Sequence, residues 1–136
     1  MITVNGIAGV FLYSNDPQKL AEWYTRNFGL QFYSDLPDTP YMVFNHPDDS
    51  DHALRRSTVF AIMPAKKPLG SERGEYMINY RVDDLAGFLQ QLQANGVETA
   101  AIEEHRDGRT EESTGYFSWI QDPEGNHIEL YQPRLD

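Results

Sequence analysis

The stretch "WIQDPEGNHIELYQP", residues 119–133, reads as a strand, a turn and a second strand. An Asp-Pro pair and a Gly-Asn pair are turn signals, and the residues after them alternate as in a half-buried strand. This alternation places one carboxylate, Glu129, among apolar neighbours. Glu129 is therefore a candidate metal ligand, proton carrier or ligand contact, or else a solvated strand residue.

Composition limits the classes of protein to which the chain can belong. Its 136 residues predict one domain, or two small modules that share a core. The absence of Cys excludes disulfides, zinc–thiolate sites, iron–sulfur clusters and cysteine nucleophiles. No apolar run approaches the ~20 residues of a membrane span, and no charged-then-apolar leader is present. We expect a soluble protein of the reducing cytoplasm, without a membrane partner.

The net charge of -10 argues against a nucleic-acid partner, because binding to phosphates depends on clustered Lys and Arg. An acidic surface attracts cationic ligands through its long-range field. An acidic surface also keeps a protein soluble, and solubility explains the negative charge at least as well as a cationic ligand does.

A strand, a capped helix and a glycine stop follow one another in residues 7–30. Asp16 is a natural N-cap, and Pro17 after it suits the first helical position. Gly29 lies where a left-handed helix end is favoured. Residues 76–97 repeat the pattern, with Asp84 as the N-cap and an Asn-Gly pair at the end.

Each predicted helix is followed by three strand candidates separated by turn residues. They are residues 30–34, 41–45 and 57–63 in the first copy, and residues 97–103, 116–121 and 127–132 in the second. The repeated order βαβββ predicts an α+β fold of two modules, about residues 5–63 and 75–133, with a linker over residues 64–74. The polar stretches 46–56 and 103–114 are predicted to be exposed loops.

Strand alternation assigns each residue to one face of its sheet. Leu12, Ile128 and Leu130 are predicted to face the helices, while their neighbours in sequence face away. Two sheets curled together by their twist would form a cup-shaped mixed sheet lined by the second set. The candidate ligand contacts in this cup, besides Glu129, are Phe11, Tyr13, Asn79, Arg81, Trp119, His127 and Tyr131.

The paired modules and above all "DPEGNHIELYQP", residues 122–133, resemble the vicinal oxygen chelate superfamily. This superfamily includes glyoxalase I, extradiol dioxygenases, and fosfomycin and bleomycin resistance proteins. The resemblance covers almost the whole chain, so it implies a single domain over residues 1–136. It also implies a homodimer.

Family members with a metal draw His and Glu ligands from four strand positions, and the resemblance places these positions on Gly9, Ala61, Met77 and Glu129. Only Glu129 suits a hard or borderline divalent metal, and tight binding needs three or four donors. No cofactor is therefore expected. A divalent-metal site that also uses His127, on the same face, stays open, whereas His105 is predicted to be a solvated loop residue.

Three functions remain open. The leading hypothesis is a metal-independent protein that binds or sequesters a small amphipathic molecule in an aromatic-lined cup. The second is an enzyme of this superfamily, a lyase, isomerase or dioxygenase, that uses Glu129 as acid or base or in an unrecognised metal site. The third is an interaction module that holds a peptide or protein partner. In each case Glu129 could instead pair with a Tyr hydroxyl or His127 and only hold the closing strand.

Overall fold

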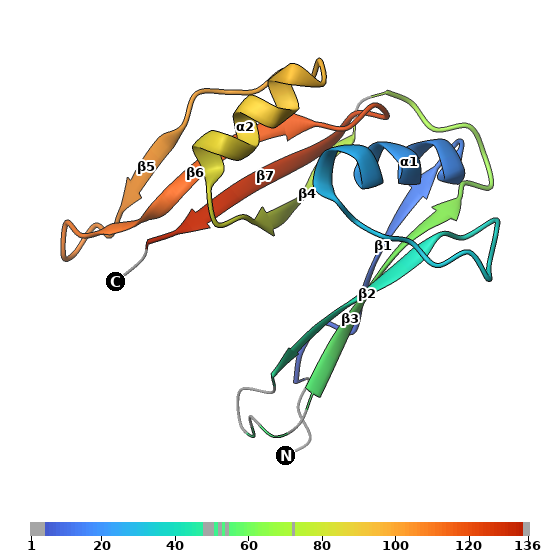
Figure 1. Ribbon diagram of the computed structural model, residues 1–136, viewed down its shortest axis with the longest axis horizontal. Coiled ribbons are helices and arrows are strands. Elements are labelled where there is room, and N and C mark those ends of the chain that lie inside the picture. Colours follow the sequence, from blue (N-terminus) through green and yellow to red (C-terminus); the bar gives the residue numbers. More distant parts are fainter. Residues whose placement is uncertain (1–4, 48–50, 52, 54, 72, 135–136) are drawn as a thin grey trace. The chain divides into compact units, whose positions relative to one another are not determined.

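The computed structural model describes residues 5–47, 51, 53, 55–71 and 73–134. The chain divides into two compact units, Met1–Leu69 and Gly70–Asp136, and each has one helix packed on a mixed sheet (Figure 1). The predicted α+β class is confirmed. In the described part of the chain, neither helix is long and apolar enough to span a membrane.

The first unit contains β1 (Gly9–Ser14), α1 (Pro17–Phe28), β2 (Tyr41–Pro47) and β3 (Arg55–Pro64). Its sheet has the order β1-β3-β2, in which β1 is parallel and β2 antiparallel to β3. The predicted helix ends are confirmed. The Asp16 carboxylate accepts the Lys19 N–H at 3.2 Å, and Gly29 ends the helix with a left-handed φ of 71°.

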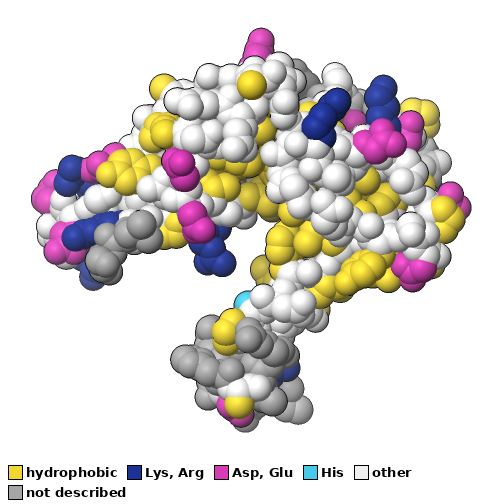
Figure 2. All heavy atoms as spheres, in the orientation of Figure 1, with side chains coloured by type: hydrophobic (Ala, Val, Ile, Leu, Met, Phe, Trp, Pro, Cys, Tyr) yellow, Lys and Arg dark blue, Asp and Glu magenta, His cyan; other side chains and the backbone are white. Residues whose placement is uncertain are grey.

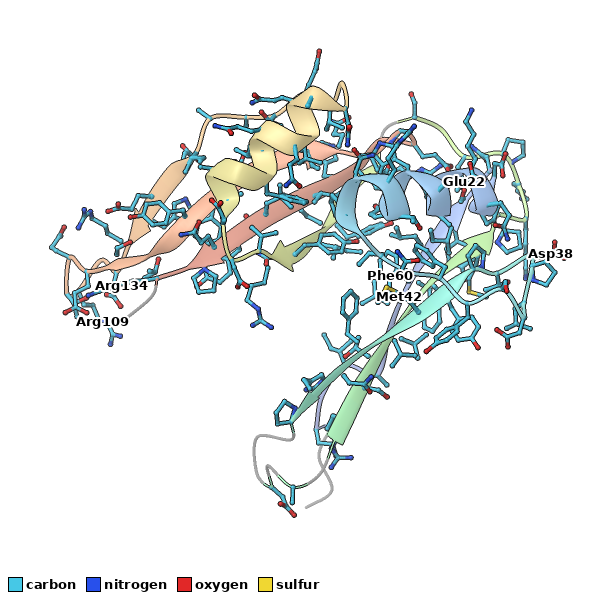
Figure 3. The ribbon with its side chains drawn as sticks, in the orientation of Figure 1. Glu22, Asp38, Met42, Phe60, Arg109 and Arg134 are labelled. Carbon is cyan, nitrogen blue, oxygen red and sulfur yellow. The ribbon has the colours of Figure 1, made fainter. Side chains whose placement is uncertain are left out.

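The core of the first unit lies between α1 and one face of this sheet. Leu12 of β1 is 1% exposed, and Ile62 of β3 is fully buried. The ring of Tyr24 on α1 lies 5.6 Å from that of Phe60 in an edge contact. Phe60 pairs in register with Met42 of β2, and the two lie side by side in Figure 3. Along β1, Leu12 is buried as predicted, whereas its neighbours Phe11 and Tyr13 are exposed.

The second unit contains β4 (Arg73–Arg81), α2 (Leu85–Ala94), β5 (Glu103–Arg106), β6 (Ser113–Gln121) and β7 (Asn126–Pro133). Its sheet has the order β4-β7-β6-β5. β4 runs parallel to β7, while β6 runs antiparallel to both β7 and β5. This unit therefore has the predicted order βαβββ.

The helix α2 covers one face of the second sheet. Its N-cap is Asp84, as predicted, whose carboxylate accepts the Gly87 N–H at 3.0 Å. The buried residues between helix and sheet are Leu85, Leu89, Leu92, Ile120, Ile128 and Leu130. Their burial leaves the other side chains of β6 and β7 on the opposite face of the sheet.

Two predicted strands, residues 30–34 and 97–103, are wrong. In the first stretch only Tyr33 pairs, through an isolated bridge to Tyr41. In the second, the strand begins only at Glu103, and Ala100 is held beside β6 by two hydrogen bonds, one from its N–H to the Trp119 carbonyl at 3.2 Å. Apolar residues favour a strand locally, but a ladder also needs a partner strand in register.

The predicted loop over residues 103–114 is also wrong, because its two ends form the β5–β6 hairpin. All four residues of β5 are exposed, and an edge strand without a buried face cannot be told from a loop by hydropathy. Charged side chains of both signs gather around its turn (Figure 2), among them Arg109 and Arg134 (Figure 3). The ends of the other predicted loop, residues 46–56, belong to β2 and β3. Residues 48–50, 52 and 54 of that loop lie outside the described residues.

Candidate functional site

The face of the second sheet that points away from α2 carries most of the predicted ligand contacts. We call it the aromatic face and define it by Met77, Asn79, Arg81, His105, Phe117, Trp119, His127, Glu129 and Tyr131. On β7, Ile128 and Leu130 are buried under α2, whereas the alternating residues His127, Glu129 and Tyr131 are half-buried. Strand alternation thus separates the core from this face.

Glu129 lies at the centre of the aromatic face, between neighbours on two other strands. Strand register places Asn79 of β4 on one side of it and Trp119 of β6 on the other. Asn79 Nδ2 donates to Glu129 Oε1 at 2.6 Å, and Trp119 Nε1 donates to Glu129 Oε2 at 2.9 Å. Each carboxylate oxygen therefore accepts a hydrogen bond from one neutral donor, and the two bonds fix the orientation of the carboxylate. These partners replace the Tyr hydroxyl and His127 that were considered from the sequence.

A row of stacked rings crosses three strands next to this carboxylate. The ring of His105 on β5 lies 4.4 Å from that of Phe117, at an interplanar angle of 30°. The ring of Phe117 lies 4.8 Å from that of Tyr131, at 25°. Tyr131 Oη donates to the Thr114 carbonyl at 3.0 Å. The Tyr131 ring is therefore held both by this hydrogen bond and by its stacking on Phe117.

Sequence reasoning missed two members of this row, Phe117 and His105. Phe117 precedes Trp119 by two residues in the same strand, so alternation could have placed the two on one face. His105 was predicted to be a solvated loop residue, and it is an exposed strand residue stacked on Phe117. No local pattern marks its strand, because the strand has no buried side chain.

The other ionisable side chains near the aromatic face lie at its margins. Arg81 of β4 is exposed and pairs in register with Tyr131 of β7. Glu103 of β5 is exposed and pairs in register with Phe117 of β6. His127 is half-buried and pairs in register with Met77. Among the described residues, none of these forms an ion pair with Glu129.

Two predicted ligand contacts, Phe11 and Tyr13, belong to β1 of the first unit. They are 53% and 51% exposed, on the face of that sheet opposite α1. The structure thus brings together Asn79, Arg81, Trp119, His127, Glu129 and Tyr131 on one face, and places Phe11 and Tyr13 on another sheet.

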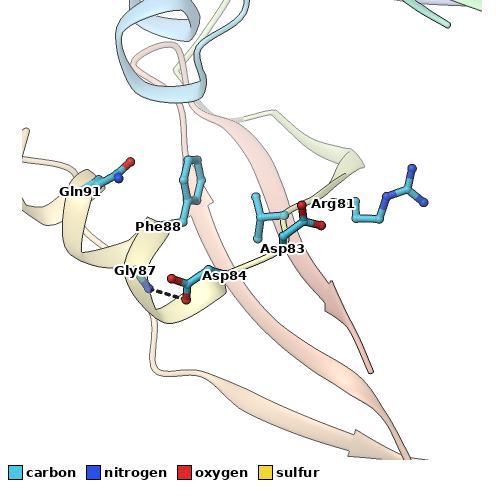
Figure 4. Close-up of a pocket in the computed structure, with 7 residues that line it drawn as sticks. Arg81, Asp83, Asp84, Gly87, Phe88 and Gln91 are labelled. Atoms are coloured by element: carbon cyan, nitrogen blue, oxygen red, sulfur yellow. Dashed lines mark hydrogen bonds between the residues drawn. The ribbon is translucent and has the colours of Figure 1, made fainter. Parts of the chain in front are cut away.

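A hollow of about 480 Å³ lies beside the start of α2 (Figure 4). Its lining includes the predicted contact Arg81, together with Asp83, Asp84 and Phe88. The Asp84 carboxylate already caps α2 through the Gly87 N–H. The Asp84 carboxylate is therefore already engaged at the helix start, and the aromatic face, which carries most of the predicted contacts, is the better candidate site.

The sequence and the fold agree on one family. A profile of the Glyoxalase/Bleomycin resistance protein/Dioxygenase superfamily matches residues 6–130. The chain belongs to this superfamily. No curated protein matches the sequence.

Solved structures with a similar fold include proteins whose names refer to antibiotic binding or antibiotic resistance. An integron cassette protein from the mobile metagenome of V. Pseudocholerae has 13% identity and a TM-score of 0.71, over 99% of both chains. TnmS3, an antibiotic binding protein from a Streptomyces species, has 22% identity and a TM-score of 0.62, over 98% of this chain and 100% of its own. FosX, a fosfomycin resistance protein from Listeria monocytogenes, has 16% identity and a TM-score of 0.65, over 98% of this chain and 97% of its own. At these identities the likeness shows the fold alone.

Members of the superfamily often use a divalent metal, but the residues at the four positions to which the resemblance assigns the ligands do not fit one. Gly9 has no side chain to offer, and Ala61 is apolar and 3% exposed. Met77 is a soft ligand, which leaves the Glu129 carboxylate with a hydrogen-bond donor on each oxygen. Within the described ranges, no three His, Asp or Glu side chains come close enough to hold a metal ion.

Proposed function

We propose that this superfamily member binds or sequesters a small amphipathic molecule on its aromatic face, without the family metal. The observation that carries the proposal is the juxtaposition of the stacked row His105–Phe117–Tyr131 with the oriented carboxylate of Glu129. Aromatic rings supply contact area, and a few fixed polar groups orient the ligand. The name of TnmS3, an antibiotic binding protein of the same fold, supports this choice.

The proposal has further parts that concern the assembly and the first unit. Phe11 and Tyr13, both more than half exposed, are proposed as ligand contacts of the first unit. Asn79, Arg81, Trp119, His127 and Tyr131 are proposed as contacts of the second. We also propose that the protein acts as a homodimer in the cytoplasm.

Binding of an uncharged planar aromatic compound tests the proposal directly. We expect acridine, under conditions where it is uncharged, to change the tryptophan fluorescence and to bind saturably. Phe117→Leu removes the middle ring of the row, and we expect it to weaken binding about three- to tenfold, because one aromatic contact contributes about 0.5–1.5 kcal/mol. Phe44→Leu is the matched control, since Phe44 is 40% exposed on β2 of the other unit. Equal losses in both variants would show that the row is not the site.

Metal content tests the part of the proposal that concerns the metal, namely that the ligand binds without it. Protein purified without an affinity tag or chelator, then exposed to Ni, Zn, Fe, Mn or Mg, should contain far less than stoichiometric metal by elemental analysis, because one carboxylate does not form a divalent site. Glu129→Ala should leave the trace content unchanged. Stoichiometric metal that disappears in Glu129→Ala would contradict the proposal and favour a metal-dependent lyase or dioxygenase.

An acid–base role for Glu129 is the alternative function. It is favoured by the fixed orientation of the carboxylate, which has acceptor positions left beyond those used by Asn79 and Trp119. Loss of turnover in Glu129→Gln, with ligand binding retained, would support this enzyme over a binding protein.

A further inference from the structure

The Glu129 carboxylate is half-buried and is held only by neutral groups. Its described partners are the amide of Asn79 and the indole of Trp119. The contrast within the same unit is Glu124, a carboxylate also largely buried, which forms an ion pair with Arg73 at 3.0 Å. The described residues provide no such cation for Glu129.

An anion that is partly removed from water is stabilised most by a positive charge. The two N–H donors satisfy one position on each oxygen but leave the net charge of Glu129 uncompensated. An ionised carboxylate accepts about four hydrogen bonds, so about two positions remain for a ligand. A ligand with a positively charged nitrogen would supply the missing charge, and the net charge of -10 on the chain acts in the same direction over a longer range.

The rings beside Glu129 favour the same kind of ligand. Trp119 is anchored beside the carboxylate by its own N–H, and ring faces of Trp and Tyr attract cations. Tyr131 follows Glu129 by two residues on the same face of β7, a spacing of roughly 7 Å along a strand. Its ring stacks on Phe117, which provides a surface for a planar group.

We infer that the ligand of this site is an organic cation carried by a planar aromatic ring system. This inference rests on the proposed function and names the class of its ligand. The cationic nitrogen contacts the free acceptor positions of Glu129, and the ring system packs on the pair Phe117–Tyr131. Arg81, exposed beside Tyr131, repels a cation from that margin and so fixes which end of the ligand meets Glu129.

The test compares three probes with one ring system and different charges: N-methylacridinium, uncharged acridine and acridine-9-carboxylate. Affinities are measured by tryptophan fluorescence and by calorimetry, at one moderate salt concentration. We expect N-methylacridinium to bind about tenfold more tightly than acridine, and the anion to bind more weakly than either.

Two variants that remove the same charge separate the site from the general field. In Glu129→Gln the preference for the cation should fall to within about twofold, while acridine affinity persists and shows that the face is intact. Glu103→Gln removes an exposed carboxylate at the margin of the same face, and it should keep most of the preference.

Each other outcome has a distinct meaning. Equal affinities for the three probes, or a preference that survives in Glu129→Gln, would overturn the ligand class and leave the proposed function standing. An equal loss in Glu103→Gln and Glu129→Gln would assign the preference to the overall charge and overturn the role of Glu129. Absence of saturable binding for all three probes would overturn the proposed function itself.

Discussion

Asp122→Ala is expected to destabilise the second unit by roughly 3 kcal/mol, because it removes the acceptor that organises the turn before β7. Asp122 is 5% exposed. Its Oδ1 accepts the N–H groups of Glu124 at 2.9 Å and Asn126 at 3.0 Å, and its Oδ2 accepts Asn126 Nδ2 at 2.7 Å. Alanine would leave these donors without their acceptor in a site that excludes water.

The effect would extend beyond the turn, because Asn126 is itself a connection to β4. Asn126 is 2% exposed, and its Oδ1 accepts the Tyr76 hydroxyl at 3.1 Å. Loss of the Asp122 carboxylate would free the Asn126 amide and loosen this link between β7 and β4. β7 carries Glu129 and Tyr131, so the aromatic face depends on this turn for its register.

Urea denaturation measures the change in the free energy of unfolding. An m-value equal to that of the unmodified protein shows that the shift of the midpoint reports stability. The matched control is Asp107→Ala, another turn aspartate of the same unit, whose Oδ1 accepts the Arg109 N–H at 2.7 Å in an exposed position. We expect this control to lose less than about 1 kcal/mol, because water can replace the lost acceptor. A loss in Asp122→Ala no larger than that of the control would refute our account of the turn.

Gly115→Ala should destabilise the second unit by about 3 kcal/mol and displace the Tyr131 ring. Gly115 lies in β6 with a φ of +133°, a region that favours glycine. A Cβ at this position would lie 2.5 Å from the Gln132 carbonyl oxygen and 2.6 Å from Tyr131 Cε1. The backbone of β7 cannot move away without breaking the β6–β7 ladder, so the added methyl group must distort both strands.

Gly96→Ala is a control in which alanine is placed at a positive φ without an overlap. Gly96 also has a positive φ, of +83°, but no atom outside its neighbours lies within 4 Å of an added Cβ. We expect it to lose about 1 kcal/mol, the usual cost of a left-handed alanine. The excess loss in Gly115→Ala, measured in urea, then contains the overlap together with the greater strain of an alanine at a φ of +133°. Weaker acridine binding would report the displaced ring. Equal losses in the two variants would show that Tyr131 and Gln132 adjust freely around position 115.

Local chemistry accounts for what could be predicted of the fold. Asp16 and Asp84 mark helix starts because a carboxylate can accept backbone N–H groups that the first turn leaves unpaired. Gly29 marks a helix end because it adopts a left-handed conformation without a clash. Hydropathy failed at residues 30–34, 97–102 and 103–106, where a partner strand rather than composition decides whether a ladder forms.

The sequence by itself determined that Glu129 lies on the face of β7 opposite Ile128 and Leu130, because side chains alternate along any strand. Only the tertiary structure decided which groups meet it there. Asn79 is fifty residues away along the chain, and strand register alone brings its amide to the carboxylate. The β5–β6 and β6–β7 pairings likewise bring His105, Phe117 and Tyr131 into one row. Register depends on the ladder as a whole, so no local pattern could reveal these contacts.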